Sequence, residues 1–354
     1  MIRINPAAAA TPVPPAPHVL GRYPGYDASA PALEITGLSV VFPGDHGPTA
    51  VVDDVGYSVD AGKSLAVIGE SGSGKSITVR AVMGILPRQA RVTSGTVRLS
   101  GVDVGTLGDA VFRRLRGSAI GMVFQDSLSA LNPVLPVGYQ IAEVFRVHRG
   151  MGRKVSNRRA IEMLDRVRIP SPEHRARQYP HEFSGGMRQR VMIAMALSLD
   201  PAVLIADEPT TALDVTVQAQ IMELLADLRA ERNMALVLIS HDLGVVADTA
   251  DEIAVMYGGR IVERAPADEL YRKPRHPYTR ALLAAIPGRH TRGRRLAVLP
   301  GSPPDPSRLP AGCAFRPRCA DSDDDCLARP ALRQVGPSRL SACHRNEEVV
   351  ENER

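Results

Sequence analysis

The stretch SLAVIGESGSGKS, residues 64–76, constrains the fold more than any other part of the sequence. A short apolar run of strand length leads directly into a glycine-rich loop, and we expect a helix to begin near Lys75. The loop fits G-x-x-x-x-G-K-[ST] with Gly69, Gly74, Lys75 and Ser76. The order strand, loop, helix predicts a P-loop rather than an ordinary glycine-rich turn.

The residue types of this loop suit a bound nucleotide and Mg²⁺. Glycines let the backbone N–H groups wrap around phosphates, and Ser71, Gly72 and Ser73 complete the loop between the motif positions. Lys75 is expected to reach the β- and γ-phosphates, and the hydroxyl of Ser76 to contact Mg²⁺.

Two further apolar runs, AVLIADE and ALVLISHD, are predicted as strands of the same parallel sheet. The first ends in Asp207 and Glu208, and the second leads to His241. Asp207 is expected to hold Mg²⁺, usually through a water, and Glu208 to polarise an attacking water as a general base. An acidic strand end alone is weak evidence for a site of ATP hydrolysis. In a chain that also has a P-loop, it becomes strong evidence for such a site.

The chain divides into three predicted parts. Residues 1–31 have an alanine cluster interrupted by prolines, which is typical of a disordered tail and not of a signal peptide. Residues 32–264 are expected to form an α/β P-loop NTPase with a RecA-like parallel sheet. The alternating stretches ALEITGLSVVF and VVDDVGYSVDAG add an antiparallel layer, and residues 125–190 add a helical subdomain. Residues 265–354 are rich in Pro and Arg and predict a small loop-rich C-terminal domain.

A second glycine motif, EFSGGMRQR, opens the predicted helix that continues as VMIAMALSL. Ser184, Gly185 and Gly186 lie at its start, where backbone N–H groups and the helix dipole favour an anion. One bound nucleotide does not need two phosphate sites, so this second site predicts a phosphate held by another subunit.

The ordered set GESGSGKS, FQD, FSGGMRQR, VLIADE, TALD and ISHD resembles an ABC-transporter ATPase over about Leu33 to Arg264. In that family two ATP molecules lie between two head-to-tail subunits. The resemblance implies that Ser184 and Gly186 contact the γ-phosphate bound by a partner's P-loop. Phe183 and Met187 depart from the commonest signature, which has leucine and glutamine there, but the Ser-Gly-Gly core is intact.

Further roles are implied by the same resemblance. Gln125 resembles the glutamine that senses the γ-phosphate or Mg²⁺ beside the contact with the membrane subunit. His241 resembles the histidine that holds the γ-phosphate and the attacking water, and Asp214 resembles the aspartate that links the two sites. Phe42 is a candidate for stacking on adenine, and a core position is the equal alternative.

The C-terminal part indicates which group of ABC-transporter ATPases this sequence resembles. The stretches YRKPRHPYTRALLAAIPG and LPGSPPDPSRLPAGCAFRPRC are similar to the extension of dipeptide and oligopeptide importer ATPases, whose relatives carry nickel or glutathione. This resemblance implies a second ATPase subunit, often a different chain, two permease subunits and an extracytoplasmic solute-binding protein. The chain is then expected at the cytoplasmic face of the membrane, attached through the permeases.

Composition excludes other function classes. The longest apolar runs, such as VMIAMAL, fall far short of the ~18 residues of a membrane span. The net charge is +5, and the main basic cluster, Arg289 to Arg295, lacks interleaved aromatic residues, so no nucleic-acid partner is expected.

The alternative, a soluble ABC ATPase acting on nucleic acid or ribosomes, would call for a long coiled-coil insertion or tandem cassettes, which this sequence lacks. An exporter ATPase would not carry this C-terminal extension.

The four cysteines, Cys313, Cys319, Cys326 and Cys343, all lie in the C-terminal part. Disulfides are uncommon in the cytosol, and the spacings are wider than the paired C-x₂₋₄-C of zinc sites. An iron–sulfur cluster, a zinc site and free thiols all remain open. Some members of the peptide-importer family are thought to bind a [4Fe–4S] cluster at such cysteines, and we expect one here that folds the C-terminal domain.

Overall fold

The computed structural model describes residues 19–44, 47–211, 213–286 and 299–346. The basic cluster Arg289 to Arg295 and most of the predicted N-terminal tail lie outside these ranges. The rest of that tail is ordered: Val19–Arg22 forms a short 3₁₀-helix, η1, and the side chain of Leu20 is fully buried. The predicted disordered segment therefore does not extend to residue 31, because an apolar residue anchors its end to the core.

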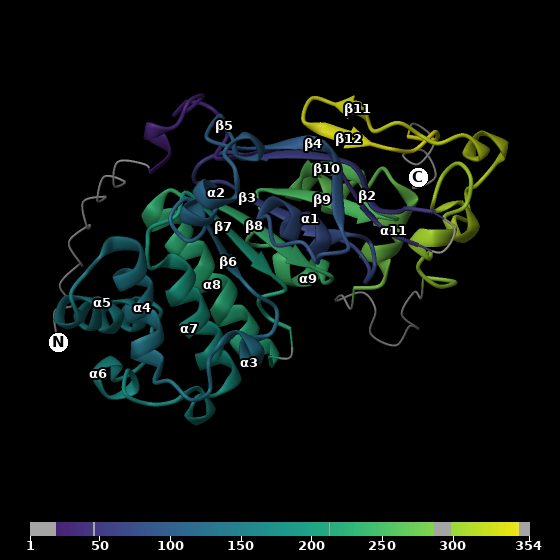
Figure 1. The fold of residues 1–354 in the computed structure, drawn as a ribbon. Coiled ribbons are helices and arrows are strands. Elements are labelled where there is room, and N and C mark those ends of the chain that lie inside the picture. Colours follow the sequence, from purple (N-terminus) through teal and green to yellow (C-terminus); the bar gives the residue numbers. More distant parts are fainter. Residues whose placement is uncertain (1–18, 45–46, 212, 287–298, 347–354) are drawn as a thin grey trace.

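Among the described residues the strands form two sheets, which Figure 1 shows with their helices. The smaller sheet has the order β2-β1-β4-β5 and antiparallel pairing. Its strands are β1 (Leu33–Phe42), β2 (Thr49–Val59), β4 (Arg91–Leu99) and β5 (Val102–Asp103). This is the antiparallel layer that the alternating sequence predicts.

The larger sheet has the order β11-β12-β10-β9-β3-β8-β7-β6 among the described residues. Pairing is parallel from β9 through β3, β8 and β7 to β6, and antiparallel from β9 through β10 and β12 to β11. Its strands are β3 (Ser64–Ile68), β6 (Ile120–Val123), β7 (Val203–Asp207), β8 (Ala235–Ser240), β9 (Glu252–Tyr257), β10 (Arg260–Pro266), β11 (Arg333–Gly336) and β12 (Arg339–Ser341). The P-loop fold with a parallel sheet is thereby confirmed.

The parallel strands are buried on both faces. In β3, Leu65 and Val67 pack into one apolar cluster with the antiparallel sheet, whereas Ala66 and Ile68 pack into the other. Alternate side chains of a strand point to opposite faces, so a strand covered on both sides reads as a continuous apolar run. This explains why SLAVI and ALVLIS are readable as strands from sequence alone.

Helices cover the two faces of the larger sheet. Figure 1 shows α4, α5 and α6 grouped at one end of the molecule, beside α7 and α8. The helices are α1 (Lys75–Val82), α2 (Asp109–Leu115), α3 (Ser127–Ala130), α4 (Val137–Arg149), α5 (Arg153–Arg166), α6 (Pro172–Arg175), α7 (Gly185–Leu197), α8 (Val215–Arg232), α9 (Leu243–Val246), α10 (Ala267–Arg272) and α11 (Pro277–Ala284). Within the described ranges no helix combines the length and apolarity needed to cross a membrane.

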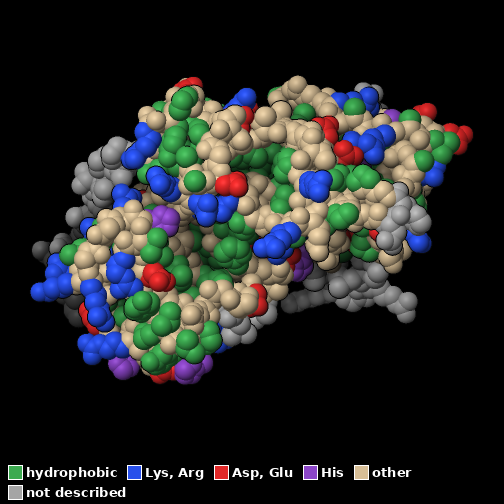
Figure 2. All heavy atoms as spheres, in the orientation of Figure 1, with side chains coloured by type: hydrophobic (Ala, Val, Ile, Leu, Met, Phe, Trp, Pro, Cys, Tyr) green, Lys and Arg blue, Asp and Glu red, His purple; other side chains and the backbone are tan. Residues whose placement is uncertain are grey.

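Helix α5 of the helical subdomain has one apolar face and one basic face. Helix α5 buries Ala160, Met163 and Leu164 and exposes a basic face, and Figure 2 shows Lys and Arg side chains along this outer edge. The apolar face joins the same core cluster as α7 and α8. The subdomain is therefore packed firmly onto the sheet through its apolar side.

The C-terminal region differs from the separate domain that the sequence suggests. Its strand β12 pairs with β10 of the main sheet, opposite Glu263 and Arg264, and β11 pairs with β12. Figure 1 shows this hairpin beside β10, with loops and 3₁₀ turns beyond it. The loop-rich texture is present, but the region shares a sheet with the rest of the chain.

Candidate functional site

The P-loop adopts a shape that only glycine permits at several positions. Gly72 and Gly74 have φ angles of +81° and +100°, in the left-handed region. A Cβ on Gly69 would lie 2.3 Å from the carbonyl oxygen of Met256. Ser71 and Gly72 form the exposed tip of the loop. The backbone is thus free to approach phosphate oxygens closely.

The lysine of the loop is buried against its own backbone. Lys75 is 5% exposed, and its Nζ donates to the carbonyl oxygens of Gly69 at 2.6 Å and Glu70 at 2.9 Å. It also lies 3.4 Å from Ser73 Oγ. Burial lowers the pKa of Lys75. The ammonium is held against the loop, where the sequence motif predicts that phosphates bind.

Ser76 and Asp207 meet across the start of α1 and the end of β7. Ser76 Oγ donates to Asp207 Oδ1 at 3.1 Å, and Asp207 is 3% exposed. Burial raises the pKa of Asp207. A hydroxyl and a carboxylate side by side are the oxygen ligands that Mg²⁺ prefers, so these two residues fit a magnesium ion.

Glu208 is the point where three loops converge. Its carboxylate accepts hydrogen bonds at 2.9 Å from Gln125 Nε2 and from Thr211 Oγ1. Nδ1 of His241 lies 3.3 Å from the other carboxylate oxygen. Glu208 itself has a φ of +47°, which is unusual for a residue other than glycine. These residues follow the neighbouring strands β6, β7 and β8, whose carboxyl ends meet at one edge of the sheet (Figure 1).

The second glycine motif lies at the start of α7. Ser184 is exposed and caps the helix, with its Oγ accepting from the Met187 N–H at 3.3 Å. A Cβ on Gly186 would lie 2.5 Å from a methyl group of Val217 in α8, which explains glycine at that position. Gly185 is half-buried. Helix α7 packs on the sheet face opposite to α1, so the two glycine motifs begin helices on different sides of the sheet (Figure 1).

Two other predicted site residues have local roles in the structure. Asp214 is exposed and caps α8, accepting from the Val217 N–H at 3.0 Å. Phe42 ends β1 opposite Thr49 and is half-buried against the core of the antiparallel layer. The partial burial of Phe42 is compatible both with a core position and with stacking on adenine. Its contact with adenine stays a prediction.

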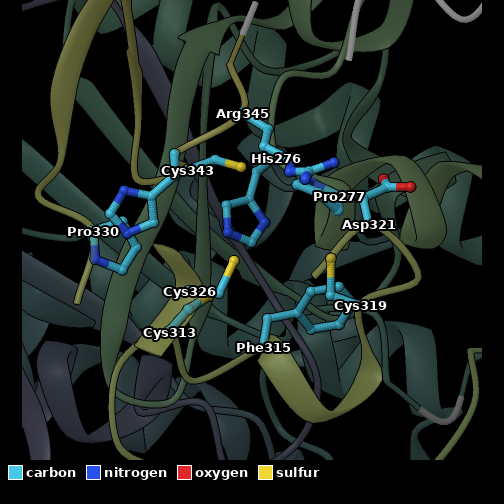
Figure 3. Close-up of a pocket in the computed structure, with 11 residues that line it drawn as sticks. His276, Pro277, Cys313, Phe315, Cys319, Asp321, Cys326, Pro330, Cys343 and Arg345 are labelled. Carbon is cyan, nitrogen blue, oxygen red and sulfur yellow. The ribbon is translucent and has the colours of Figure 1, made fainter. Parts of the chain in front are cut away.

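All four cysteine side chains line one pocket, with His276 and Phe315 in its wall. Figure 3 shows the sulfur atoms of Cys319, Cys326 and Cys343 turned toward the space around His276. The pocket has about 350 Å³ of atom-free space, part of it open to solvent, and all four thiols are free. Within the described ranges, no three His, Cys, Asp or Glu side chains are arranged to hold a single metal ion.

The thiols are partly buried in this pocket, and backbone N–H groups lie beside the sulfurs. Burial raises the pKa of Cys343 to about 11 and also raises the pKa of Cys313 and Cys319. Backbone hydrogen bonds oppose this rise, from Phe315 and Arg316 to Cys313, from Asp321 to Cys319 and from Arg345 to Cys343. The pocket thus disfavours bare thiolates but supplies N–H donors to the sulfurs.

A buried carboxylate joins the C-terminal region to the main sheet. Glu263 is 0% exposed and accepts from the backbone N–H groups of Arg275 at 2.7 Å and His276 at 2.9 Å. It also pairs with Arg339 Nη2 at 3.0 Å. Burial lowers the pKa of His276 to about 3, so its ring is neutral beside the cysteines.

Sequence reasoning missed four residues at these sites. Thr211 touches Glu208, and Glu70, Tyr278 and Arg318 meet beside the P-loop. Thr211 follows the acidic strand end closely enough to be suspected from sequence. The other contacts join positions more than two hundred residues apart, and no local pattern indicates them.

Comparison with known proteins shows the family of the chain. Residues 52–211 match the ABC transporter family, and residues 262–326 match the oligopeptide/dipeptide transporter C-terminal region. A putative peptide import ATP-binding protein of Brucella abortus is 49% identical over 315 residues, which are 89% of this chain and 95% of that protein. The oligopeptide transport ATP-binding protein OppD of Mycobacterium tuberculosis is 50% identical over 324 residues, 91% of this chain but 53% of that longer protein.

Solved structures resemble the nucleotide-binding part. The ATP-binding cassette MJ0796, in a dimeric post-hydrolysis state bound to ADP and Pi, has a TM-score of 0.60 and 26% identity, covering 66% of this chain and 98% of that one. The cbiO1 protein of Clostridium perfringens, part of the ABC transporter complex cbiONQ, has a TM-score of 0.60 and 27% identity, covering 69% and 92%. This chain is an ABC-type ATPase coupled to transport, and it belongs to the ATP-binding subunits of the oligopeptide and dipeptide import family.

Proposed function

We propose that this chain powers the import of dipeptides, oligopeptides or related solutes by hydrolysing ATP in a head-to-tail pair with a second ATPase subunit. The convergence of Gln125, Thr211 and His241 on Glu208, next to Ser76 and Asp207, carries the proposal. The peptide import named for the Brucella and Mycobacterium relatives supports the solute class.

Each residue of the site has a proposed role. Lys75 and the loop backbone bind the β- and γ-phosphates, and Ser76, Asp207 and Gln125 hold Mg²⁺, with Asp207 acting through a water. Glu208 takes a proton from the attacking water, and hydrogen bonds from Gln125 and Thr211 to one of its carboxylate oxygens hold it in place. His241 positions the γ-phosphate and the water. Bound Mg²⁺ would supply charge neutralisation at the phosphates.

The second half of the ATP site is proposed to come from the partner. Ser184 lies exposed at the start of a helix of thirteen residues, where the N–H groups of the first turn are available to an anion. A Cβ on Gly185 or Gly186 would meet Leu213 or Val217 of the same chain, so glycine at these positions lets the helix start pack closely. Asp214, at the start of α8, is proposed to link the two ATP sites. The dimeric cassette MJ0796 supports such pairing.

Substitution of Ser184 by Arg tests this arrangement in trans. The bulky cation should fill the space of the partner's γ-phosphate, so that turnover of the assembled transporter falls while this chain still binds ATP. Ser171→Arg, at another exposed helix start in the helical subdomain, is the matched control and should keep normal turnover. Loss of ATP affinity in isolated Ser184→Arg chains would contradict the head-to-tail proposal.

The transport partners are proposed to be two permease subunits, a second ATPase that is a different chain, and an extracytoplasmic solute-binding protein. This assembly would place the chain at the cytoplasmic face of the membrane. Purification of the complex, with mass spectrometry of its subunits and of the solute on the binding protein, tests the assignment. Recovery with RNA or DNA and without permeases would instead favour the nucleic-acid alternative.

We further propose that the cysteine pocket holds a [4Fe–4S] cluster, bound by Cys313, Cys319, Cys326 and Cys343. Four cysteines lining one pocket support a cluster more than zinc, because each sulfur of a cluster binds a different iron and need not approach one point. The N–H donors to the sulfurs are the kind of contact that stabilises cluster thiolates. When bound, the cluster would supply folding free energy to a region with little apolar core.

Anaerobic purification tests the cluster. A brown protein with about four irons per chain and broad absorbance near ~400 nm is expected for Cys₄ ligation. Replacement of Cys326, the most buried of the four, by Ser should reduce the iron content. Stoichiometric zinc without iron, or four freely titrating thiols in a folded C-terminal region, would refute the proposal.

A further inference from the structure

Glu70, the second residue of the GESGSGKS loop, is held by two residues from the C-terminal region. The guanidinium of Arg318 donates to both carboxylate oxygens of Glu70, at 2.6 and 3.1 Å. The backbone N–H of Glu70 donates to the hydroxyl oxygen of Tyr278 in α11 at 2.9 Å. Side chain and backbone of one loop residue are therefore both fixed from outside the nucleotide-binding part of the chain.

Arg318 is firmly placed for this contact. Its side chain is only 6% exposed, and its Nε donates to the carbonyl oxygen of Pro300 at 2.7 Å. Its Nη1 lies 3.3 Å from the hydroxyl of Tyr257, over whose ring the guanidinium sits. A two-pronged pair between arginine and a carboxylate is directional as well as strong, so it restrains where Glu70 can lie.

The restraint on Glu70 acts close to the phosphate-binding lysine. The carbonyl oxygen of Glu70 accepts from Lys75 Nζ at 2.9 Å and from the backbone N–H of Ser73 at 3.2 Å. Movement of Glu70 would therefore move an acceptor of the lysine and the turn that carries Ser71 and Gly72. Glu70 thus connects Arg318 to the lysine and to the turn of the loop.

The support for Glu70 continues to the cysteine pocket. Tyr257, Tyr278 and Phe315 pack against one another with ring centroids 4.5 to 5.4 Å apart, and all three are buried. Phe315 lines the cysteine pocket, and Arg318 directly precedes Cys319. A compact aromatic cluster thus lies between the pocket and the P-loop.

We propose that Arg318 is a positioning residue for ATP binding: through Glu70, and with Tyr278 holding the backbone, it keeps the P-loop in its phosphate-binding shape. The C-terminal region is then a structural part of this chain's own ATP site. This proposal rests on the assignment of the P-loop to the phosphates, which Lys75→Ala tests separately by loss of ATP binding.

A double-mutant cycle on the full-length chain tests the proposal. The variants are Arg318→Met, Glu70→Gln and the combination, and the measured quantity is the Kd for ATP with Mg²⁺. Each single change is expected to weaken binding by about tenfold, and the double change by no more than either alone, because both remove one interaction. Arg318→Lys should restore part of the affinity, since it keeps the charge but not the two-pronged geometry.

A matched control separates positioning from general damage to the C-terminal region. Arg280 pairs with Asp321 in the same region, away from Glu70, so Arg280→Gln should leave the Kd unchanged. In the assembled transporter, Arg318→Met should raise KM for ATP and leave kcat nearly unchanged. Thermal unfolding and cysteine accessibility of each variant show whether the region stays folded.

Two results would overturn the proposal. One is an unchanged Kd in Glu70→Gln, a variant that leaves the C-terminal region intact even if Arg318→Met does not fold. The other is additive effects in the double variant, which would mean that Arg318 and Glu70 act independently.

Discussion

The nucleotide-binding edge of the sheet and the cysteine pocket are built in opposite ways. Every residue of β3, β7 and β8 is buried, and the polar site residues follow directly where these apolar strands end. In the C-terminal region, no residue of β11 is buried, and the buried groups include Arg339 and Ser341. Hydrophobic burial places the first site, whereas the second also depends on ion pairs and backbone hydrogen bonds around the buried Phe315.

This difference predicts different vulnerabilities. The catalytic edge should tolerate loss of a single polar group without unfolding, because the strands beneath it hold their shape. The C-terminal region should lose structure when a buried polar partner is removed, because the charge left behind is buried without its partner. Variants that change one region and spare the other can break or sharpen the comparison.

The largest effect is expected at the catalytic edge. Glu208→Gln should lower turnover by about 10² to 10⁴-fold while ATP affinity and stability stay unchanged, because the amide cannot take a proton. ATP-bound dimers should accumulate. The assay uses the transporter with the partner's ATPase site disabled, and Glu223→Gln on the exposed face of α8 is the control. Turnover like that of the wild type would remove Glu208 from its proposed role.

Glu263 is expected to matter for stability and not for chemistry. Glu263→Gln leaves the buried Arg339 without its close carboxylate and should lower the free energy of unfolding by about 3 to 5 kcal/mol. Glu269→Gln is a matched control, since Glu269 is exposed and 4.0 Å from the same arginine, and it should change stability by under about 1 kcal/mol. Urea unfolding measures both, and equal effects would argue against the buried pair as the anchor.

Removal of the proposed cluster should loosen the cysteine side and spare the buried strands beneath the catalytic edge. Chelation under reducing conditions should raise amide exchange at Arg316–Arg318 and Asp324–Leu327 by about a hundredfold, and leave β3, β7 and β8 protected. A chain with all four cysteines changed to serine should show the raised exchange without chelator. Uniform change over the whole chain would show that the two regions do not differ in this way.

The smallest effect is expected at Thr211. Thr211→Val removes one hydrogen bond to Glu208 and should lower turnover about fivefold, with no change in stability. Thr216→Val, at an exposed position in α8, is the control. An effect as large as that of Glu208→Gln would mean that Thr211 does more than orient the carboxylate.

Sequence reasoning succeeded where local pattern and chemistry coincide. The runs SLAVI, VLIAD and ALVLIS are readable as strands because both of their faces are buried, and the P-loop, Asp207, Glu208 and His241 follow directly from strand ends. The order of these motifs predicted the fold and the family.

Long-range polar contacts could not be predicted in the same way. Strands β11 and β12 are short, and their letters, RQVG and RLS, show no alternation of apolar and polar residues. The pairing of β12 with β10 depends on the tertiary arrangement. The same is true of the pair Arg318 and Glu70, because arginine and glutamate usually lie at the surface and neither residue alone indicates a partner. The same holds for Val19–Arg22, whose one buried leucine has no periodic neighbours.

The pairing of β12 with β10 also has a consequence for synthesis of the chain. Strand β10 leaves the ribosome well before β12, so the nascent nucleotide-binding part carries an open sheet edge until the C-terminal residues emerge. An open edge can pair with another nascent chain, and aggregation of intermediates is a hazard in proteins of this size. Ribosome-bound chains that stop before Arg333 are the species in which that hazard is greatest, and chaperone binding to β10 should be strongest there.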